Sequence, residues 1–187
     1  AGLENGLEIH HDGDLPARSG IGSSSSFTVG FLNALYAHQS KMVNKQELAE
    51  QAIHVEQKLA KECVGIQDQI LASYGGLQVI EMGPENKFDV RPLILPKEYR
   101  DDLESHILLG FSGLQRFSSD AAAEQVSNIK NKSSFSQLNE IHAIAKEAYA
   151  LLKDNAHLEK LGKLFDATWK LKRTLTKTMS NETIDLM

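Results

Sequence analysis

The stretch from Ser19 to Phe27, SGIGSSSSF, constrains this chain most, because it sets two glycines and four serines directly before an apolar helical pattern. Apolar residues recur at helical spacings beyond it, which predicts a helix from Ser23 to about His38. Glycines let the backbone approach a ligand closely, and the start of a helix offers free N–H groups and the positive end of its dipole. The pattern therefore predicts either an anion site of the kind that binds phosphate or a plain turn that Ser23 or Ser24 caps.

This loop differs from the common P-loop of nucleotide-binding proteins. The P-loop needs a lysine, then a serine or threonine, after its second glycine. Here Gly22 is followed by Ser23, so the phosphate-binding lysine of that motif is absent. The charge of a bound phosphate would have to be neutralised by the helix dipole, a metal ion and residues elsewhere in the chain.

The remaining patterns predict an α+β chain with its strands early and its helices late. A second helix fits Lys45 to about Leu59 with Asn44 as its cap, and a short third helix follows Gly65. Strands are expected at Leu7–His11, Leu77–Met82, Phe88–Leu95 and His106–Phe111. Further helices are expected at Ser119–Lys130, Ser134–Lys153 and His157–Thr174. Asn181 or Ser180 is expected to cap a last helix.

Composition narrows the class of protein. The single cysteine, Cys63, rules out an internal disulfide framework and fits a reducing cytoplasm. The net charge is −5 and no basic stripe dominates, which argues against a general nucleic-acid binder. No apolar run approaches the length of a membrane span, and no secretory signal opens the chain. We therefore expect a cytoplasmic protein with neither nucleic acid nor membrane as a partner.

Two motifs carry a resemblance to a known family. The loop with its helix, LPARSGIGSSSSFTVGFLNAL, resembles the phosphate-binding motif of the GHMP kinases, the family of galactokinase, homoserine kinase, mevalonate kinase and phosphomevalonate kinase. A second stretch, HVEQKLAKECVGIQDQILASYGG, resembles the part of that family in which a glutamate precedes a Gly-x-x-Asp-Gln segment. Within the family, GIQDQ, GGLQVIEM and RFSSD are most similar to the kinases of D-glycero-D-manno-heptose 7-phosphate, with fucose kinase and galactokinase as near alternatives.

The resemblance implies roles for the matched residues. Asp68 is the implied catalytic residue, which contacts the substrate hydroxyl and either accepts its proton or holds and polarises it. Glu56 is the implied magnesium ligand, together with the hydroxyl of Ser24. The alternatives are that Asp68 caps the short helix and that Glu56 is a solvated helix residue. The rival carboxylates are Glu47, Glu50 and Glu62. The N–H groups that would surround the ATP phosphates belong to Gly20, Ile21, Gly22, Ser23, Ser24 and Ser25, whereas Ser26 is expected to face the helix interior.

Other polar residues are candidates for the substrate. Arg116 follows a predicted strand and offers bidentate geometry to a sugar phosphate, an interpretation that we weigh equally with a surface arginine. Lys172 and Arg173 end a helix, where they favour its dipole, and a phosphate role is the weaker interpretation. His10 and His11 alternate across a predicted strand, which argues against a zinc site, and either histidine stays a candidate for lining the substrate pocket.

The resemblance implies an ATP- and magnesium-dependent enzyme that transfers the γ-phosphoryl group to a sugar hydroxyl, most closely the anomeric hydroxyl of the heptose 7-phosphate. The alternatives are a galactokinase- or fucokinase-like enzyme and a non-catalytic protein that keeps the nucleotide loop. The partners are ATP and a sugar or sugar phosphate, and a homodimer stays open.

The implied fold has two lobes. Residues 1–95 would be part of an N-terminal lobe like ribosomal protein S5 domain 2, and residues 96–187 part of a helical, ferredoxin-like C-terminal lobe. We expect both lobes to be incomplete, as in an internal fragment. The family's N-terminal strand-loop and C-terminal glycine-rich loop have no counterpart in this sequence.

Overall fold

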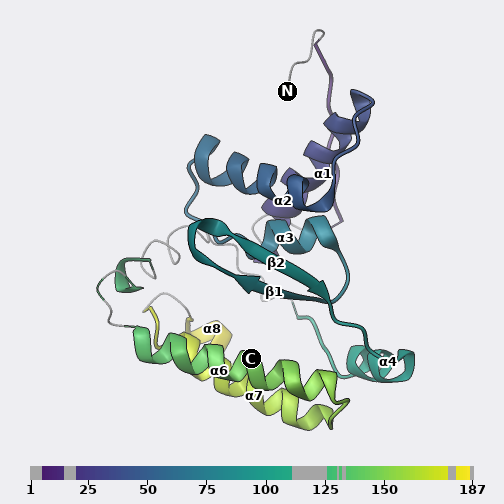
Figure 1. Cartoon of the computed structure of the whole chain (residues 1–187). Helices are drawn as coiled ribbons and strands as arrows, with labels where there is room; N and C mark the ends of the chain where they lie inside the picture. Colours follow the sequence, from purple (N-terminus) through teal and green to yellow (C-terminus); the bar gives the residue numbers. More distant parts are fainter. Residues whose placement is uncertain are drawn as a thin grey trace. The chain divides into compact units, whose positions relative to one another are not determined.

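A computed structural model describes residues 6–14, 20–110, 126–129, 131, 134–176 and 180–185 (Figure 1). Contacts divide the described residues into two compact units, one that ends at Gly75 and one that starts at Gly76. Helices and a small sheet are both present, so the predicted α+β class is confirmed. The predicted lobes, residues 1–95 and 96–187, stay a prediction.

The first unit is a cluster of helices. They are α1 (Ser23–His38), α2 (Lys45–His54), the π-helix η1 (Val55–Leu59) that continues α2, and α3 (Gln67–Tyr74). Asn44 caps α2 as predicted, because its Oδ1 accepts a hydrogen bond from the Glu47 N–H at 2.8 Å. The glycine at 75 ends α3 with a φ of 68°, a backbone conformation that favours glycine. The three helices predicted here are confirmed.

Apolar side chains hold α1 against α2. Val29 of α1 packs with Leu48 and Ala52 of α2, and the partly buried Leu32 and Val43 cover this cluster. Burying an aliphatic side chain in this way stabilises a fold by about 1.5–3 kcal/mol. The cluster therefore holds the middle of α1 against α2.

The second unit contains an antiparallel hairpin of β1 (Gln78–Met82) and β2 (Phe88–Pro92), joined through η2 (Pro84–Asn86). Ile80 pairs with Val90 at its centre. This confirms the strands expected on either side of the GPEN turn.

The long helices of the second unit also follow the prediction. They are α6 (Phe135–Lys153) and α7 (Leu158–Arg173), which pack side by side, and the short α8 (Glu182–Asp185) follows (Figure 1). Asn181 caps α8, since its Oδ1 accepts a hydrogen bond from the Ile184 N–H at 3.0 Å. A helix was expected at residues 119–130, of which the structure describes 126–129, and these four residues are helical. Residues 119–125 and 130 lie outside the described part of the chain.

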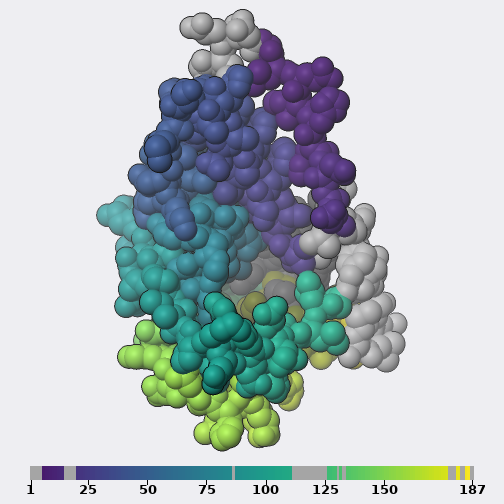
Figure 2. Space-filling view, turned by 90° about the vertical axis from the view of Figure 1, so that its right-hand side faces the viewer, coloured from purple at the N-terminus to yellow at the C-terminus, as the bar shows by residue number. Residues whose placement is uncertain are grey.

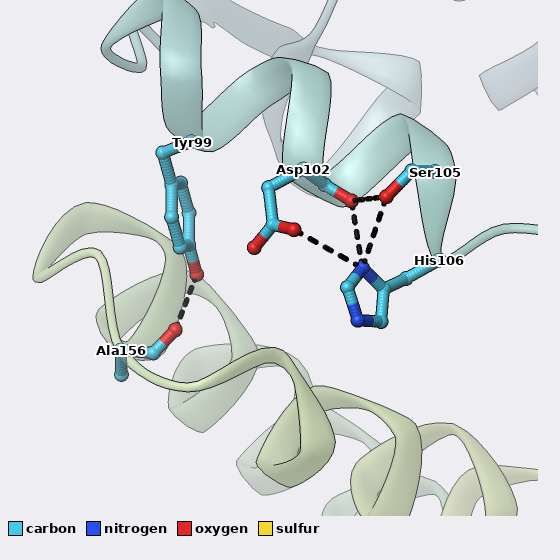
Figure 3. A network of polar contacts seen from close by, with 5 residues as sticks. All are labelled: Tyr99, Asp102, Ser105, His106 and Ala156. Carbon is cyan, nitrogen blue, oxygen red and sulfur yellow. Dashed lines mark hydrogen bonds and ion pairs between the residues drawn. The ribbon is translucent and has the colours of Figure 1, made fainter.

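The helix α4 (Lys97–Ser105) was not predicted. The Tyr99 hydroxyl donates a hydrogen bond of 2.7 Å to the Ala156 carbonyl, which ties α4 to the turn between α6 and α7 (Figure 3). Burial, and then the nearby carboxylate of Asp102, raises the pKa of Tyr99 above its usual value of 10.0.

Two predicted strands are wrong. Residues 7–11 form no strand; they run along the surface beside α1, as the purple segment of Figure 2 shows. Residues 106–110 form no strand either, and Leu108 is 97% exposed. An apolar run becomes a buried strand only where another strand supplies the hydrogen bonds and another layer covers it, and neither occurs among the described residues.

No helix in the described ranges combines the length and the apolar character that crossing a membrane requires.

Candidate active site

The loop before α1 has a backbone that suits glycine. Gly20 and Gly22 have φ values of 79° and 73°, in the left-handed region that other residues rarely adopt. Gly22 is the N-cap of α1 and no side chain caps the helix, so the predicted serine cap is wrong. The first helical hydrogen bond runs from the Ser26 N–H to the Gly22 carbonyl at 2.9 Å. The N–H groups of the three serines before Ser26 therefore precede the helical ladder and can bind an anion.

Asp68 lies against this loop. A Cβ atom added to Gly22 would stand 3.2 Å from the Asp68 Cγ and 3.3 Å from its Oδ2. Asp68 is in the first turn of α3 and is exposed. The alternative that Asp68 caps α3 is wrong, because the N-cap is Ile66 and no side chain makes a capping bond. Glycine is therefore favoured at position 22 for two reasons: its backbone adopts a positive φ, and its lack of a side chain leaves space for the Asp68 carboxylate.

Glu56 is buried, with 3% of its surface exposed, so the alternative of a solvated helix residue is wrong. Its Oε2 accepts hydrogen bonds from the Ser25 hydroxyl at 2.9 Å and from the Gln69 amide. Its Oε1 accepts from the Thr28 hydroxyl at 3.0 Å and from the Ser24 hydroxyl at 3.3 Å. Four side chains from α1 and α3 therefore converge on one carboxylate.

The π-helix η1 carries this glutamate. The Ala60 N–H donates to the Val55 carbonyl at 2.8 Å, five residues back, instead of four as in an α-helix. Such single π-turns change the direction of side chains and recur at functional sites. The rival carboxylates, Glu47, Glu50 and Glu62, are all exposed.

Sequence reasoning missed two members of this site, Thr28 and Gln69. Thr28 stands four positions after Ser24 and so on the same face of α1, a signal that the sequence does hold. The sequence marks Gln69 only as the glutamine of the Gly-x-x-Asp-Gln segment, which by itself assigns it no role. Ser26 was expected to face inward, but Ser26 is exposed and Ser25 is 5% exposed.

The oxygens at Glu56 fit a divalent cation such as Mg²⁺. Octahedral Mg²⁺ with bonds of about 2.1 Å holds neighbouring ligand oxygens about 3.0 Å apart. The Ser24 Oγ and the Glu56 Oε1 are 3.3 Å apart, close to that spacing. Within the part of the chain that the structure describes, no three His, Cys, Asp or Glu residues form a metal cluster. The cation would therefore need oxygens from phosphate and water, which is the usual way that Mg²⁺ binds with nucleotides.

The other candidates lie apart from this site or outside the description. Arg116 falls outside the described residues. Arg173 forms an ion pair with Asp185 at 2.7 Å, while Lys172 is exposed. His10 pairs with Glu8 at 2.9 Å. The His11 ring meets the Phe27 ring edge-on, with 4.7 Å between their centroids.

A serine, a histidine and an aspartate also meet in the second unit (Figure 3). The Ser105 Oγ and the Asp102 Oδ1 lie 3.3 and 3.5 Å from the same ring atom, the His106 Nδ1. A catalytic triad needs the two partners on different ring nitrogens. This cluster is therefore no catalytic triad.

Comparisons with known proteins indicate which family this chain resembles. Residues 1–76 match the family model described as the GHMP kinases N terminal domain, which confirms the resemblance to this family. The chain is 25% identical over 181 residues to a D-glycero-alpha-D-manno-heptose 7-phosphate kinase of Campylobacter jejuni, covering 96% of this chain and 52% of that protein. It is 25% identical over 187 residues to a bifunctional fucokinase/GDP-fucose pyrophosphorylase of Arabidopsis thaliana, covering 96% of this chain and 17% of that protein. The chain thus spans about half, or less, of the length of these curated relatives.

Proposed function

We propose, from the GHMP kinase N-terminal domain in residues 1–76, that this chain belongs to an ATP-dependent kinase that phosphorylates a sugar hydroxyl. One observation carries the proposal. The uncapped start of α1, the carboxylate of Asp68 and the carboxylate of Glu56 meet around the same glycine–serine loop. A protein that only binds nucleotide has no need of a carboxylate at that loop, so the arrangement supports an enzyme.

The residues divide the chemistry between them. The loop residues, Gly20, Ile21, Gly22, Ser23, Ser24 and Ser25, would hold the β- and γ-phosphates of ATP through backbone N–H groups. Asp68 would position the acceptor hydroxyl and take its proton. Most of the catalysis in phosphoryl transfer is positioning and electrostatic stabilisation, which suits a preformed loop of this kind.

Glu56 and Ser24 would hold Mg²⁺ with oxygens of the nucleotide. When bound, the cation neutralises negative charge on the phosphates. The lack of a P-loop lysine makes this neutralisation more important here than in enzymes that have one.

For the substrate we propose the anomeric hydroxyl of D-glycero-D-manno-heptose 7-phosphate. The hydroxyl oxygen bonds to the γ-phosphorus, the bond to the β–γ bridging oxygen breaks, and ADP leaves with that electron pair. The support is the relative that is named as a heptose 7-phosphate kinase. Because another relative is named as a fucokinase, a different sugar is the alternative substrate. Arg116 stays our candidate for the 7-phosphate. We place the reaction in the cytoplasm, for which the single cysteine is the support.

The test is ADP release from Mg-ATP with heptose 7-phosphate, galactose, fucose and mevalonate in parallel. We expect Asp68→Asn to lower turnover by about 10²–10⁴-fold, as for loss of a general base, and to leave ATP affinity in place. Glu62→Gln, at an exposed carboxylate, is the control and should leave turnover unchanged. ATP binding with no turnover on any acceptor, in parent and variant alike, would favour the non-catalytic alternative, and no ATP binding would overturn the proposal.

A further inference from the structure

We propose that Gln69 is a positioning residue that fixes the Glu56 carboxylate for Mg²⁺-ATP, an inference that rests on the proposed function. Gln69 is fully buried in the first turn of α3, and its Nε2 donates to the Glu56 Oε2. Among the described residues, its side chain makes no hydrogen bond other than the one to Glu56. Its effect on the reaction would pass through Glu56 alone.

The orientation of the Gln69 amide follows from chemistry. If the amide were turned over, its Oε1 would face the carboxylate, acceptor against acceptor, so the Nε2 must point to Glu56. In that orientation the Oε1 is buried and has no hydrogen-bond partner among the described residues. Buried amides usually pair both of their groups. Gln69 pairs only its donor, which indicates that the donor is what this position requires.

The two oxygens of Glu56 have different surroundings. Oε2 receives its hydrogen bonds from Ser25 and Gln69, both buried, while Oε1 faces the exposed Ser24 and the half-buried Thr28. Oε2 is thus the anchored oxygen, and Oε1 is the one that shares a cation with the Ser24 hydroxyl. Gln69 holds the carboxylate from the inner side, as the hydrogen-bond partners behind metal ligands do in other proteins.

The same helical turn holds the other carboxylate. Asp68, next to Gln69, lies against Gly22. Their two side chains leave α3 in different directions, because successive helical residues are separated by about 100°. One turn of α3 thereby fixes the distance between the magnesium ligand and the residue that receives the acceptor proton.

The experiment is ATP binding by calorimetry at increasing Mg²⁺, on the whole chain. Gln69→Met keeps the volume and removes the donor. We expect it to raise the Mg²⁺ concentration for half-maximal ATP binding by about tenfold, the lower end of the range for such partners, and to leave affinity for metal-free ATP unchanged. Ile70→Val is the matched control. Ile70 is also fully buried in α3, so its variant should lower thermal stability without changing the Mg²⁺ dependence.

The outcomes separate this inference from the proposed function. If Gln69→Met folds and has the Mg²⁺ dependence of the parent, Gln69 is a packing residue and the inference is overturned. If Ile70→Val changes the Mg²⁺ dependence equally, the effect belongs to stability, and the inference is again overturned. If the parent itself binds ATP without regard to Mg²⁺, the magnesium part of the proposed function fails, and this inference fails with it. Gln69→Leu replaces Gln69→Met should the latter not fold.

Discussion

Two clusters of polar side chains, one in each unit, have similar residues and very different construction. Around Glu56, side chains come from positions 24, 25, 28 and 69, and the carboxylate is buried. Around His106, the partners are Asp102 and Ser105, which lie within one turn of α4, and all three are exposed (Figure 3). Helix geometry alone brings the second set together, whereas only the tertiary fold brings the first set together. A buried carboxylate that binds side chains from distant positions in the sequence is thus the better sign of a functional site.

The largest difference is expected for removal of one carboxylate from each cluster. Glu56→Gln turns an acceptor oxygen into an amide that faces hydroxyl and amide donors. We expect it to lower the free energy of unfolding by about 2–3 kcal/mol, since buried donors lose their partner. Asp102→Asn should stay within about 0.5 kcal/mol of the parent, because exposed ion pairs contribute little. Urea unfolding measures both. Equal effects would mean that burial does not distinguish the clusters.

The parts of the Glu56 cluster that depend on local chemistry could be predicted from the sequence. Gly22 and the helix after it follow from glycine and from helical spacing, and the GHMP motifs single out Glu56 and Asp68. The sequence did not reveal Gln69, because burial at that position depends on how α3 packs against α2. It misjudged Ser26, since the roll of α1 about its axis is set by its contact with Glu56 through Ser25.

The second unit shows where local patterns fail. Residues 106–110 are apolar, but apolar character predicts burial only where another element covers the segment, and Leu108 is 97% exposed. The helix α4, KEYRDDLES, was missed because it has few apolar residues to show a period. The hairpin was predicted well, because a turn of Gly, Pro and Asn between two β-prone runs is a local signal.

Two glycine substitutions test whether the conformation of the loop before α1 depends on glycine. Gly22→Ala forces a Cβ into the left-handed region and to within 3.2 Å of Asp68, so we expect a loss of about 1–2 kcal/mol of stability and lower turnover. Gly30→Ala, within α1 and with nothing within 4 Å of an added Cβ, should instead stabilise the chain by about 0.4–1 kcal/mol. Thermal and urea unfolding of the two variants should therefore show opposite signs. The same sign for both would mean that the loop conformation does not depend on glycine.

An effect smaller than those of Glu56→Gln and Gly22→Ala is expected at a partly buried contact beside the exposed cluster. Tyr99→Phe removes the hydrogen bond to the Ala156 carbonyl, which should cost about 0.5–1.5 kcal/mol at neutral pH. Because burial, and then Asp102, raises the pKa of Tyr99 in the folded chain, the hydroxyl loses its proton more readily in the unfolded chain. The contribution of the hydroxyl is therefore complete below pH 10 and declines as the pH rises through the folded-state pKa. The difference in unfolding free energy between parent and Tyr99→Phe should accordingly shrink above pH 10, as urea unfolding at several pH values would measure. A difference that stays constant across that range would show that the hydroxyl does not titrate differently in the folded chain, and that α4 is held by packing alone.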